Sequence, residues 1–446
     1  MLIKVSLILY NSHIIMCLLS QNNELTSDST EGDLDFLNEM TRLVYLALDY
    51  NPIKGTIPDL SALTKLQMLS VPNTNMYGTL PQSLSKLTDL RLLFLDDCGF
   101  DGNIDMLMGM KNLTHIYLED NHFDNTMDDT SFTELEKLVH LDISNCSFAG
   151  NVPGHLFNIS SLEVIDMSDN SLEGELPAQA LTDVEESSLK FLSLHSNKLT
   201  GAIPPSISNL KSLMTLDLSM NEFSDDIPSE IGELERLSIL FLGRNEYNEL
   251  ALDDAQWLKN LTSLTELSLK SSNLIQTIPD WLGSSLSKLL FLDLAENALT
   301  GTIPQSLQNM TDLTVLILNQ NELTGQLGLG DLIYLEVLLI DDNSLTGNTD
   351  DVCVHTITHF VSDCGGGSEE PFEAELTCEC CTLCCNDSNV TCNDSEWLGN
   401  AEGIWEFGFD RVRWAFDDGM ISPFVNYNYQ QSVESEETLA EGVEGP

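Results

Sequence analysis

One pattern returns thirteen times along this chain, with a period of about 24 residues. Its consensus is LxxLxLxxNxLxGxIP, and clear copies are LALDYNPIKGTIP at 46–58 and LDLAENALTGTIP at 292–304. A unit of this length cannot bury its own apolar face, so the units must stack into a solenoid with a shared core. The repeat therefore predicts a fold whose function lies on a long surface and not in a catalytic cleft.

The asparagine position of the pattern sets the register of the repeats, and successive copies lie 22 to 27 residues apart. This anchor position is occupied by Asn51, Thr74, Cys98, Asn121, Cys146, Asn170, Asn197, Asn221, Asn245, Ser272, Asn297, Asn321 and Asn343. Each LxL before an anchor predicts a short strand whose leucines point inward and whose intervening residues point outward. The anchor side chain is expected to pair backbone groups at the turn. Cys98 and Cys146 are interpreted as buried free thiols at this position.

The segment after each anchor resembles the plant-type leucine-rich repeat family, whose repeats read LxGxIPxxLxxLxxLxxLxLxxNx. The family's proline is matched by Pro58, Pro81, Pro153, Pro177, Pro204, Pro228, Pro279 and Pro304. The resemblance implies an α/β fold, a right-handed, curved leucine-rich repeat solenoid of about 13 repeats. It implies short parallel strands on the concave face, 3-10 or helical turns on the convex face, and a second small sheet on one flank. The third, fourth, ninth, twelfth and thirteenth repeats lack the proline, so we expect the flank sheet to be interrupted there.

The net charge of the chain restricts the classes of partner that it can bind. Lys and Arg number 18 against 71 Asp and Glu, a formal net charge of −53. No basic patch is available to neutralise phosphates, so nucleic-acid binding is disfavoured. Adhesion to an anionic membrane surface is disfavoured for the same reason. Where electrostatics contribute, the specific partners are expected to be cationic.

Cysteines are concentrated after the last repeat. Eight of the eleven cysteines lie there: Cys353, Cys364, Cys378, Cys380, Cys381, Cys384, Cys385 and Cys392. An even number at close spacing, at the open end of a solenoid, predicts a disulfide-linked cap, with 105 pairings open for four bridges. A thiolate metal cluster is the weaker interpretation, because zinc sites usually keep two or more residues between paired ligands.

Glycosylation sequons favour the same oxidising, extracellular compartment. The candidate glycosylation sites are Asn112, Asn158, Asn260, Asn309, Asn386, Asn389 and Asn393. A further sequon, at Asn145, falls beside a strand and is expected to stay unmodified. The Cys-rich cap, with GGG at 365–367 and CxCCxxCC at 378–385, resembles that of the acidic extracellular leucine-rich repeat proteins of diatoms. The repeats also resemble receptor-like protein ectodomains, so a secreted or cell-surface location is expected.

The chain divides into four predicted regions. Residues 1–33 form an apolar lead-in, 34–350 the solenoid, 351–395 the cap, and 396–446 an aromatic and then acidic tail that we expect to be partly disordered. The first twenty residues fit two interpretations. One is a signal or anchor segment, which would allow association with a membrane. The other is a degenerate repeat, with Asn23 as its anchor, which would make the chain part of a longer array.

No catalytic constellation is found: the sequence lacks HExxH, G-x-S-x-G and kinase motifs. We therefore expect a non-enzymatic protein without cofactor or metal. Exposed aromatic and acidic side chains at the outward strand positions suit ligand binding. The concave-face candidates are Tyr45, Phe94, Asp96, His115, Tyr117, Glu119, His140, Phe191, Phe241 and Phe291.

Three functions remain open at this point. The first is an extracellular or cell-surface recognition module that binds a protein, peptide or glycan on its concave face. The second is an inhibitor of a secreted hydrolase, because the polygalacturonase-inhibiting proteins share this type of repeat. The third is an acidic structural wall protein that binds cations. The oligomeric state and the identity of the ligand are not predicted.

Overall fold

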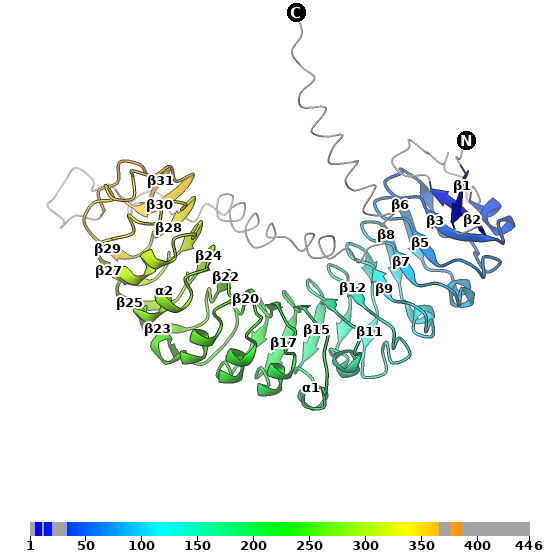
Figure 1. Cartoon of the computed structure of the whole chain (residues 1–446), viewed down its shortest axis with the longest axis horizontal. Coiled ribbons are helices and arrows are strands. Elements are labelled where there is room, and N and C mark those ends of the chain that lie inside the picture. Colours follow the sequence, from blue (N-terminus) through cyan, green and yellow to red (C-terminus); the bar gives the residue numbers. More distant parts are fainter. Residues whose placement is uncertain (1–4, 11–12, 20–33, 365–375, 386–446) are drawn as a thin grey trace, which may run out of the picture. The chain divides into compact units, whose positions relative to one another are not determined.

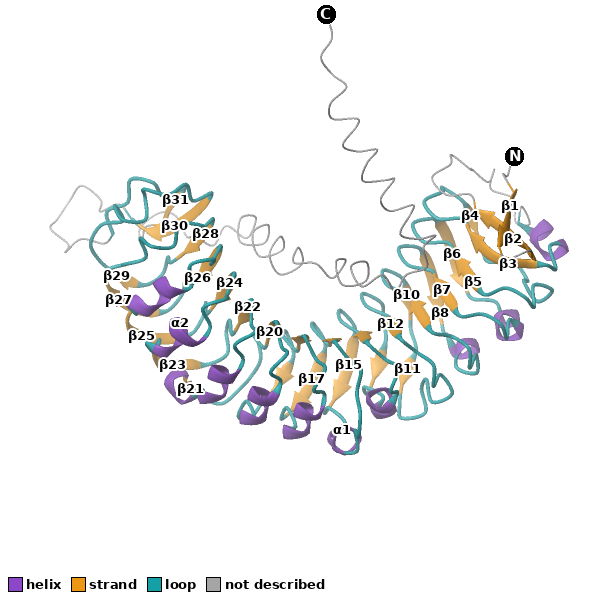
Figure 2. Cartoon of the chain, viewed as in Figure 1, coloured by secondary structure: helices purple, strands orange, loops and turns teal. Residues whose placement is uncertain are grey.

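A computed structural model describes residues 5–10, 13–19, 34–364 and 376–385. Backbone contacts group Met1–Cys384 as one unit and Cys385–Pro446 as another, and only Cys385 of the second is described. Within the first unit the repeats stack into an arc, with strands lining its concave side and short helices along its convex side (Figures 1 and 2). The α/β solenoid predicted from the repeats is confirmed.

Each repeat contributes one short strand to a continuous concave sheet. Neighbouring repeats pair in parallel, so that Leu141, for example, lies opposite Ile116 on one side and Ile165 on the other. In chain order these strands are β3 (Leu43–Ala47), β5 (Met68–Ser70), β7 (Leu92–Phe94), β9 (His115–Tyr117), β12 (His140–Asp142), β14 (Val164–Asp166), β16 (Phe191–Ser193), β18 (Thr215–Asp217), β20 (Ile239–Phe241), β22 (Glu266–Ser268), β24 (Phe291–Asp293), β26 (Val315–Ile317) and β28 (Val337–Leu339).

The N-terminal segment extends this sheet. Strands β1 (Val5–Tyr10) and β2 (His13–Leu19) form an antiparallel hairpin, and β2 pairs in parallel with β3. Residues 20–33, which include the predicted anchor Asn23, lie outside the described part. None of the helices in the described part of the chain is long and apolar enough to cross a membrane.

Short helices line the convex side. Five of the 3-10 helices begin immediately after a proline at the N-cap; Pro204 and Pro304, for example, hold φ near −70°. Proline suits the start of a helix because its φ is already restricted and its missing N–H would have no partner there. The described helices are η1 (Asp35–Glu39), η2 (Gln82–Lys86), η3 (Asp105–Leu107), η4 (Gly154–Asn158), α1 (Ala178–Thr182), η5 (Pro205–Asn209), η6 (Ser229–Glu233), η7 (Leu252–Asp254), η8 (Gln256–Asn260), α2 (Trp281–Ser285) and η9 (Gln305–Asn309).

The flank sheet predicted from the resemblance is present, as three separate ladders. The first contains β4 (Lys54–Gly55), β6 (Asn75–Thr79), β8 (Gly99–Gly102) and β10 (His122–Phe123). The second contains β11 (Thr126–Met127), β13 (Ala149–Gly150), β15 (Ser171–Gly174), β17 (Lys198–Gly201) and β19 (Glu222–Phe223). The third contains β21 (Leu250–Ala251), β23 (Leu274–Thr277), β25 (Ala298–Thr302), β27 (Glu322–Gly325) and β29 (Ser344–Leu345).

The predicted interruptions of the flank sheet are only partly correct. The ladders break in the fourth repeat, between β10 and β11, and before the ninth, between β19 and β21. They run unbroken through the third, twelfth and thirteenth repeats, where the missing proline predicted a gap. The reason is that each flank strand lies before the proline position, in the segment that follows the anchor. Proline ends the strand and starts the helix, so its loss does not remove the ladder.

The anchors hold the turns as predicted. Asn197 donates from Nδ2 to the carbonyl oxygens of Met167, Leu194 and His195 at 3.0–3.1 Å, and its Oδ1 accepts from the Leu172 N–H at 2.9 Å. One buried amide therefore pairs four backbone groups that the stacked turns would otherwise leave without partners.

Two anchor cysteines fill the same place with fewer bonds. Cys98 and Cys146 are free thiols, and each sulfur donates to one carbonyl, Val71 O and Leu118 O respectively, at 3.3 Å. Both are partly and not fully buried, which corrects the expectation of buried thiols. Burial raises the pKa of both thiols, so they stay protonated and unreactive.

The core is one continuous file of inward-pointing side chains from Leu34 to Leu376. The strand leucines dominate it, and Phe100, Phe123 and Phe148 add a stack with ring centroids 6.4 Å apart at each step. All three rings are fully buried. Because every repeat buries its apolar face against its neighbours, the length of the array stabilises each unit.

Candidate functional site

The concave sheet presents two outward ladders on either side of its central leucines. In the first ladder Leu92 lies opposite His115, and His115 opposite His140. In the second ladder Phe94 lies opposite Tyr117. The repeat thus brings together side chains that are about 24 residues apart in the sequence, at the spacing of neighbouring strands, about 4.8 Å.

These aromatic side chains stack on one another. The rings of Phe94 and Tyr117 are 4.9 Å apart, those of Tyr117 and His140 4.3 Å, and those of His140 and His115 6.2 Å. Tyr45 packs against the N-terminal end of the same group. We call these five residues the aromatic ladder. His115 and His140 come together because they occupy the same position of neighbouring repeats.

The expectation that these rings are exposed is wrong. Phe94, Tyr117 and His140 are each only 7–8% exposed, and only Tyr45 and His115 are partly open. Phe94 and Tyr117 belong to a small apolar cluster with Ala47 and Met68, separate from the main core. Strand spacing explains the difference, because a flat ring is wider than 4.8 Å and neighbouring rings cover one another.

Carboxyl groups border the aromatic ladder on the same sheet. Asp49, Asp96 and Glu119 follow the strands β3, β7 and β9, and Asp142 ends β12; we call these four residues the acid strip. Asp49 accepts from Ser70 Oγ at 2.6 Å, and Asp142 accepts from the N–H and the hydroxyl of Ser144 at 3.0 and 2.7 Å. The neighbouring charges that raise the pKa values of Asp96, Glu119 and Asp142 are those of other carboxylates, such as Asp49 for Asp96 and Glu119 for Asp142.

The acid strip is hard to ionise fully. Burial, together with the charges of Asp49 and Asp142, raises the pKa of Asp96 to about 7. Burial and the neighbouring Glu119 raise the pKa of Asp142 well above its usual range. Burial also raises the pKa of Glu119, and the hydrogen bond with Asp142 partly offsets this rise. Ionisation of either Glu119 or Asp142 therefore opposes ionisation of the other.

The histidines and the tyrosine of the ladder are uncharged. Burial lowers the pKa of His115 to about 4, although the negative charge of Glu163 acts to raise it. Burial and the nearby His115 lower the pKa of His140 to about 3. Burial also raises the pKa of Tyr117 above its usual range. The site therefore offers neutral rings beside carboxyl groups that would gain stability from a cation.

The other three candidates lie farther along the sheet. Phe241 and Phe291 approach each other, with ring centroids 6.0 Å apart and a tilt of 58° between the ring planes. Phe191 lies in register between Val164 and Thr215. Seven of the ten predicted residues thus form one cluster with the acid strip.

Three members of the site were left out of the predicted list: Asp49, Met68 and Asp142. Asp49 follows β3 and accepts from Ser70 Oγ. Met68 occupies the ladder position of the second repeat, opposite Tyr45 and Leu92. Asp142 lies opposite Tyr117, and burial raises its pKa well above the usual range. Ladder position alone would have found Met68 and Asp142.

The end of the solenoid is closed by the cysteine cap. Strand β30 (His359–Asp363) adds to the concave sheet beside β28, and β31 (Leu383–Cys385) follows, with the Thr382 N–H donating to Phe360 O at 2.9 Å. The predicted disulfides are present between Cys353 and Cys380, Cys364 and Cys384, and Cys378 and Cys381. Cys392, the side chain of Cys385, and the sequons at Asn386, Asn389 and Asn393 lie outside the described residues.

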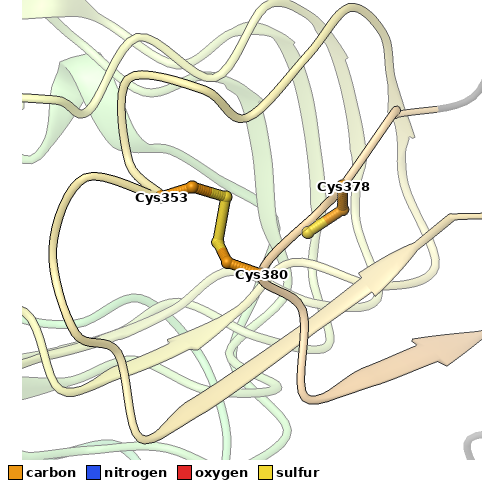
Figure 3. A group of neighbouring side chains, drawn as sticks. All are labelled: Cys353, Cys378 and Cys380. Carbon is orange, nitrogen blue, oxygen red and sulfur yellow. A yellow bond between two sulfur atoms is a disulfide. The ribbon is translucent and has the colours of Figure 1, made fainter.

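The cap sulfurs lie close enough together to suggest a metal site. Cys353, Cys378 and Cys380 have sulfur atoms within 4.8 Å of one another, but Cys353 and Cys380 are joined to each other (Figure 3). Cys378 is bonded to Cys381. A metal would need thiolates, and the bridges consume all four sulfurs. The arrangement fits a disulfide-linked cover for the last apolar repeat.

Comparison with known proteins agrees with this fold. Residues 143–276 match the leucine-rich repeat region family, and residues 262–323 the leucine rich repeat family. Receptor-like protein 31 of Arabidopsis thaliana is 37% identical over 246 residues, which cover 54% of this chain and 28% of that protein. Receptor-like protein 39 of the same plant is 30% identical over 174 residues, 38% of this chain and 19% of that protein.

Solved structures give the same picture. The crystal structure of a TDR receptor is similar with a TM-score of 0.65 and 27% identity, over 76% of this chain and 59% of that one. The ectodomain of the Arabidopsis receptor kinase HAESA, in complex with an IDA peptide hormone, has a TM-score of 0.62 and 25% identity, over 75% of this chain and 60% of that one. The chain spans less than a third of the curated relatives described above. These similarities confirm an extracellular or cell-surface location, as the cysteines predicted.

Proposed function

Because the chain belongs to the plant-type leucine-rich repeat proteins, we propose that its concave sheet binds an extended peptide outside the cell, without chemical conversion. The observation that carries this proposal is the aromatic ladder beside the acid strip. Neutral stacked rings and carboxyl groups whose pKa values are raised by burial and by one another lie on one continuous surface.

The geometry of the ladder favours an extended chain as ligand. From Tyr45 to His140 it crosses five neighbouring strands, four steps that span about 19 Å at the spacing of a β-sheet. A fully extended peptide of about six residues covers the same length. Tyr45 and His115, the two partly open rings, give apolar contact along this path with little loss of side-chain freedom, because the stack already holds them.

The acid strip favours a basic side chain in that peptide. A guanidinium or ammonium group beside Asp96, Glu119 and Asp142 would lower the pKa values that burial raises. The chain's net charge of −53 would draw such a ligand in and repel anionic competitors. The HAESA ectodomain, at 25% identity, binds the IDA peptide hormone, which supports a peptide as the ligand class.

The test begins with a random peptide library displayed on phage and selected on the full chain. Peptides that are enriched would be synthesised, and their affinities measured by calorimetry. Asp142→Asn and Glu119→Gln keep the shape of the acid strip and should each weaken binding at least about tenfold, roughly 1.4 kcal/mol. Affinity should also rise between pH 6 and 8, as Asp96, whose pKa is about 7, becomes ionised.

The matched control is Glu235→Gln, an exposed carboxyl that follows η6 on the convex side, and it should leave affinity unchanged. Enrichment of peptides that bind the acid-strip variants and the control equally would refute the proposal. So would a library from which nothing is enriched.

A further inference from the structure

The proposal in this subsection concerns the convex side and is independent of the peptide site. We propose that the convex side carries a row of N-linked glycans on Asn158, Asn260 and Asn309. Each of these asparagines is the last residue of a 3-10 helix, η4, η8 and η9 respectively. The repeat therefore places three sequons at the same point of the unit, on the helix side of the arc (Figure 2).

All three sequons expose the groups that matter for modification. The asparagines are exposed, and so are the hydroxyl residues two positions later, Ser160, Thr262 and Thr311. The residue between them packs inward: Leu261 and Met310 are fully buried, and Ile159 is partly buried against the core. The helix ends at the asparagine and the chain turns, so the amide and the hydroxyl reach solvent while the middle side chain stays in the core.

The amides of these asparagines contribute little to the folded structure. Asn158 and Asn309 make only long contacts of 3.4 Å, to Ala180 O and to Ser284 Oγ. The transferase joins Nδ2 to the anomeric carbon of a sugar carried on a lipid diphosphate. The carbon–oxygen bond to the diphosphate breaks, the diphosphate leaves with that electron pair, and Nδ2 loses one proton. The remaining N–H and the whole glycan can project into water here.

Two other sequons differ in the contacts of their amides. Asn112 donates from Nδ2 to Thr88 O at 2.8 Å and accepts from Lys137 Nζ at 2.6 Å. Asn145 has a positive φ of 44° and donates to Asp120, next to the acid strip. A glycan at either position would disturb bonds that hold neighbouring repeats together, so the row is confined to the helix ends.

The chain contains its own matched control. Lys86 ends η2 at the same position of its repeat and is exposed, and Leu87 and the exposed Thr88 follow it, so only the asparagine of a sequon is missing. The substitution Lys86→Asn completes a sequon at this helix end. If position in the repeat permits modification, residue 86 should then gain a glycan.

Such a row of glycans would limit the directions from which a protein partner can approach the chain. Glycans at three helix ends would cover the convex side and keep protein partners away from it. The concave sheet and the flank ladders lie on other sides of the unit and would stay open. Partners of this chain should therefore approach from those surfaces.

The experiment uses the full chain, directed into the secretory pathway of a eukaryotic host by an added leader. Intact mass and glycopeptide mapping are recorded before and after enzymatic removal of N-glycans. Asn158→Gln, Asn260→Gln and Asn309→Gln should each remove one glycan, and Lys86→Asn should add one. Because Asn→Gln is mild at an exposed position, each variant should be secreted as a folded protein, which resistance to a protease checks.

An unmodified asparagine at any of the three helix ends in the secreted chain would overturn the proposal. A Lys86→Asn chain that stays unmodified at residue 86 would overturn the argument from repeat position. Peptide binding measured in parallel is expected to be the same with and without the glycans, so the result does not depend on the ligand.

Discussion

The same repeats build the concave sheet, which carries the aromatic ladder and the acid strip, and the short helices of the convex side. The side chains on these two sides differ in burial and in how their charges are paired. On the concave sheet, rings are buried against one another and carboxyl groups of like charge lie together. On the convex side, opposite charges pair across neighbouring helices, as in Lys211–Glu233 at 2.8 Å, and their side chains are 56% and 59% exposed.

The difference follows from curvature. Neighbouring strands on the inside of the arc are about 4.8 Å apart, which is less than the width of an aromatic ring, so side chains exclude water from one another. On the outside of an arc, successive units are farther apart, and side chains between them remain hydrated. Burial on the inner face therefore raises the pKa of a carboxyl group, whereas hydration on the outer face removes this cause of a shift.

Removal of a ladder ring is expected to have the largest effect. Tyr117→Ala should lower the free energy of unfolding by about 3 kcal/mol, because it leaves a cavity between Phe94 and His140. Tyr77→Ala, at a residue that is 52% exposed on the flank, should change it by less than about 0.5 kcal/mol. Chemical denaturation of both variants measures the contrast, and equal effects would mean that the concave ladder is not packed like a core.

A charge substitution in the acid strip should have a smaller, pH-dependent effect. The folded-state pKa of Asp96, about 7, is above its unfolded value, so the folded chain holds more protons between about pH 4 and 7. The stability contributed by this group is present at low pH and is lost as pH rises through 7.

Asp96→Asn should therefore stabilise the protein by about 2 kcal/mol at pH 8, with no gain below about pH 4. Denaturation midpoints at a series of pH values measure this difference. Glu235→Gln, at an exposed position on the convex side, is the control. A gain of the same size at pH 3 and pH 8 would contradict the burial of the acid.

The smallest effect is expected on the convex side. The Lys211–Glu233 pair should contribute less than about 0.5 kcal/mol, because water screens two exposed charges. A double-mutant cycle with Lys211→Ala and Glu233→Ala measures the coupling at low salt and again at 1 M salt, where it should vanish. A larger coupling that resists salt would show that the two sides differ less than their exposure suggests.

Local pattern was enough for much of the fold. The thirteen anchors, the strands before them, the proline-started helices and the neighbouring positions of His115 and His140 all follow from the repeat. These features depend on contacts between residues one repeat apart, and the period places such residues side by side. The cysteine cluster likewise predicted disulfides, although its pairing required the folded chain.

Other features depended on how whole repeats fit together. The breaks in the flank sheet follow shifts between neighbouring units, as where β10 pairs with β8 at His122 while β11 pairs with β13 at Thr126. The absence of a proline from a repeat does not predict where such a shift in strand pairing occurs. The burial of Phe94 and Tyr117 also could not be seen from one repeat, because each ring is covered by the ring of the next unit.

The amino-acid sequence alone determined the solenoid, its register and its disulfide-linked end, because these depend on periodic leucines, anchors and clustered cysteines. Only the tertiary structure decided which outward residues form a site and what charge they carry. Burial and like-charge proximity on the inner side of the arc raise the pKa values of Asp96 and Asp142 and lower those of His115 and His140. Those shifts come from the distance between neighbouring repeats, which a single repeat does not contain.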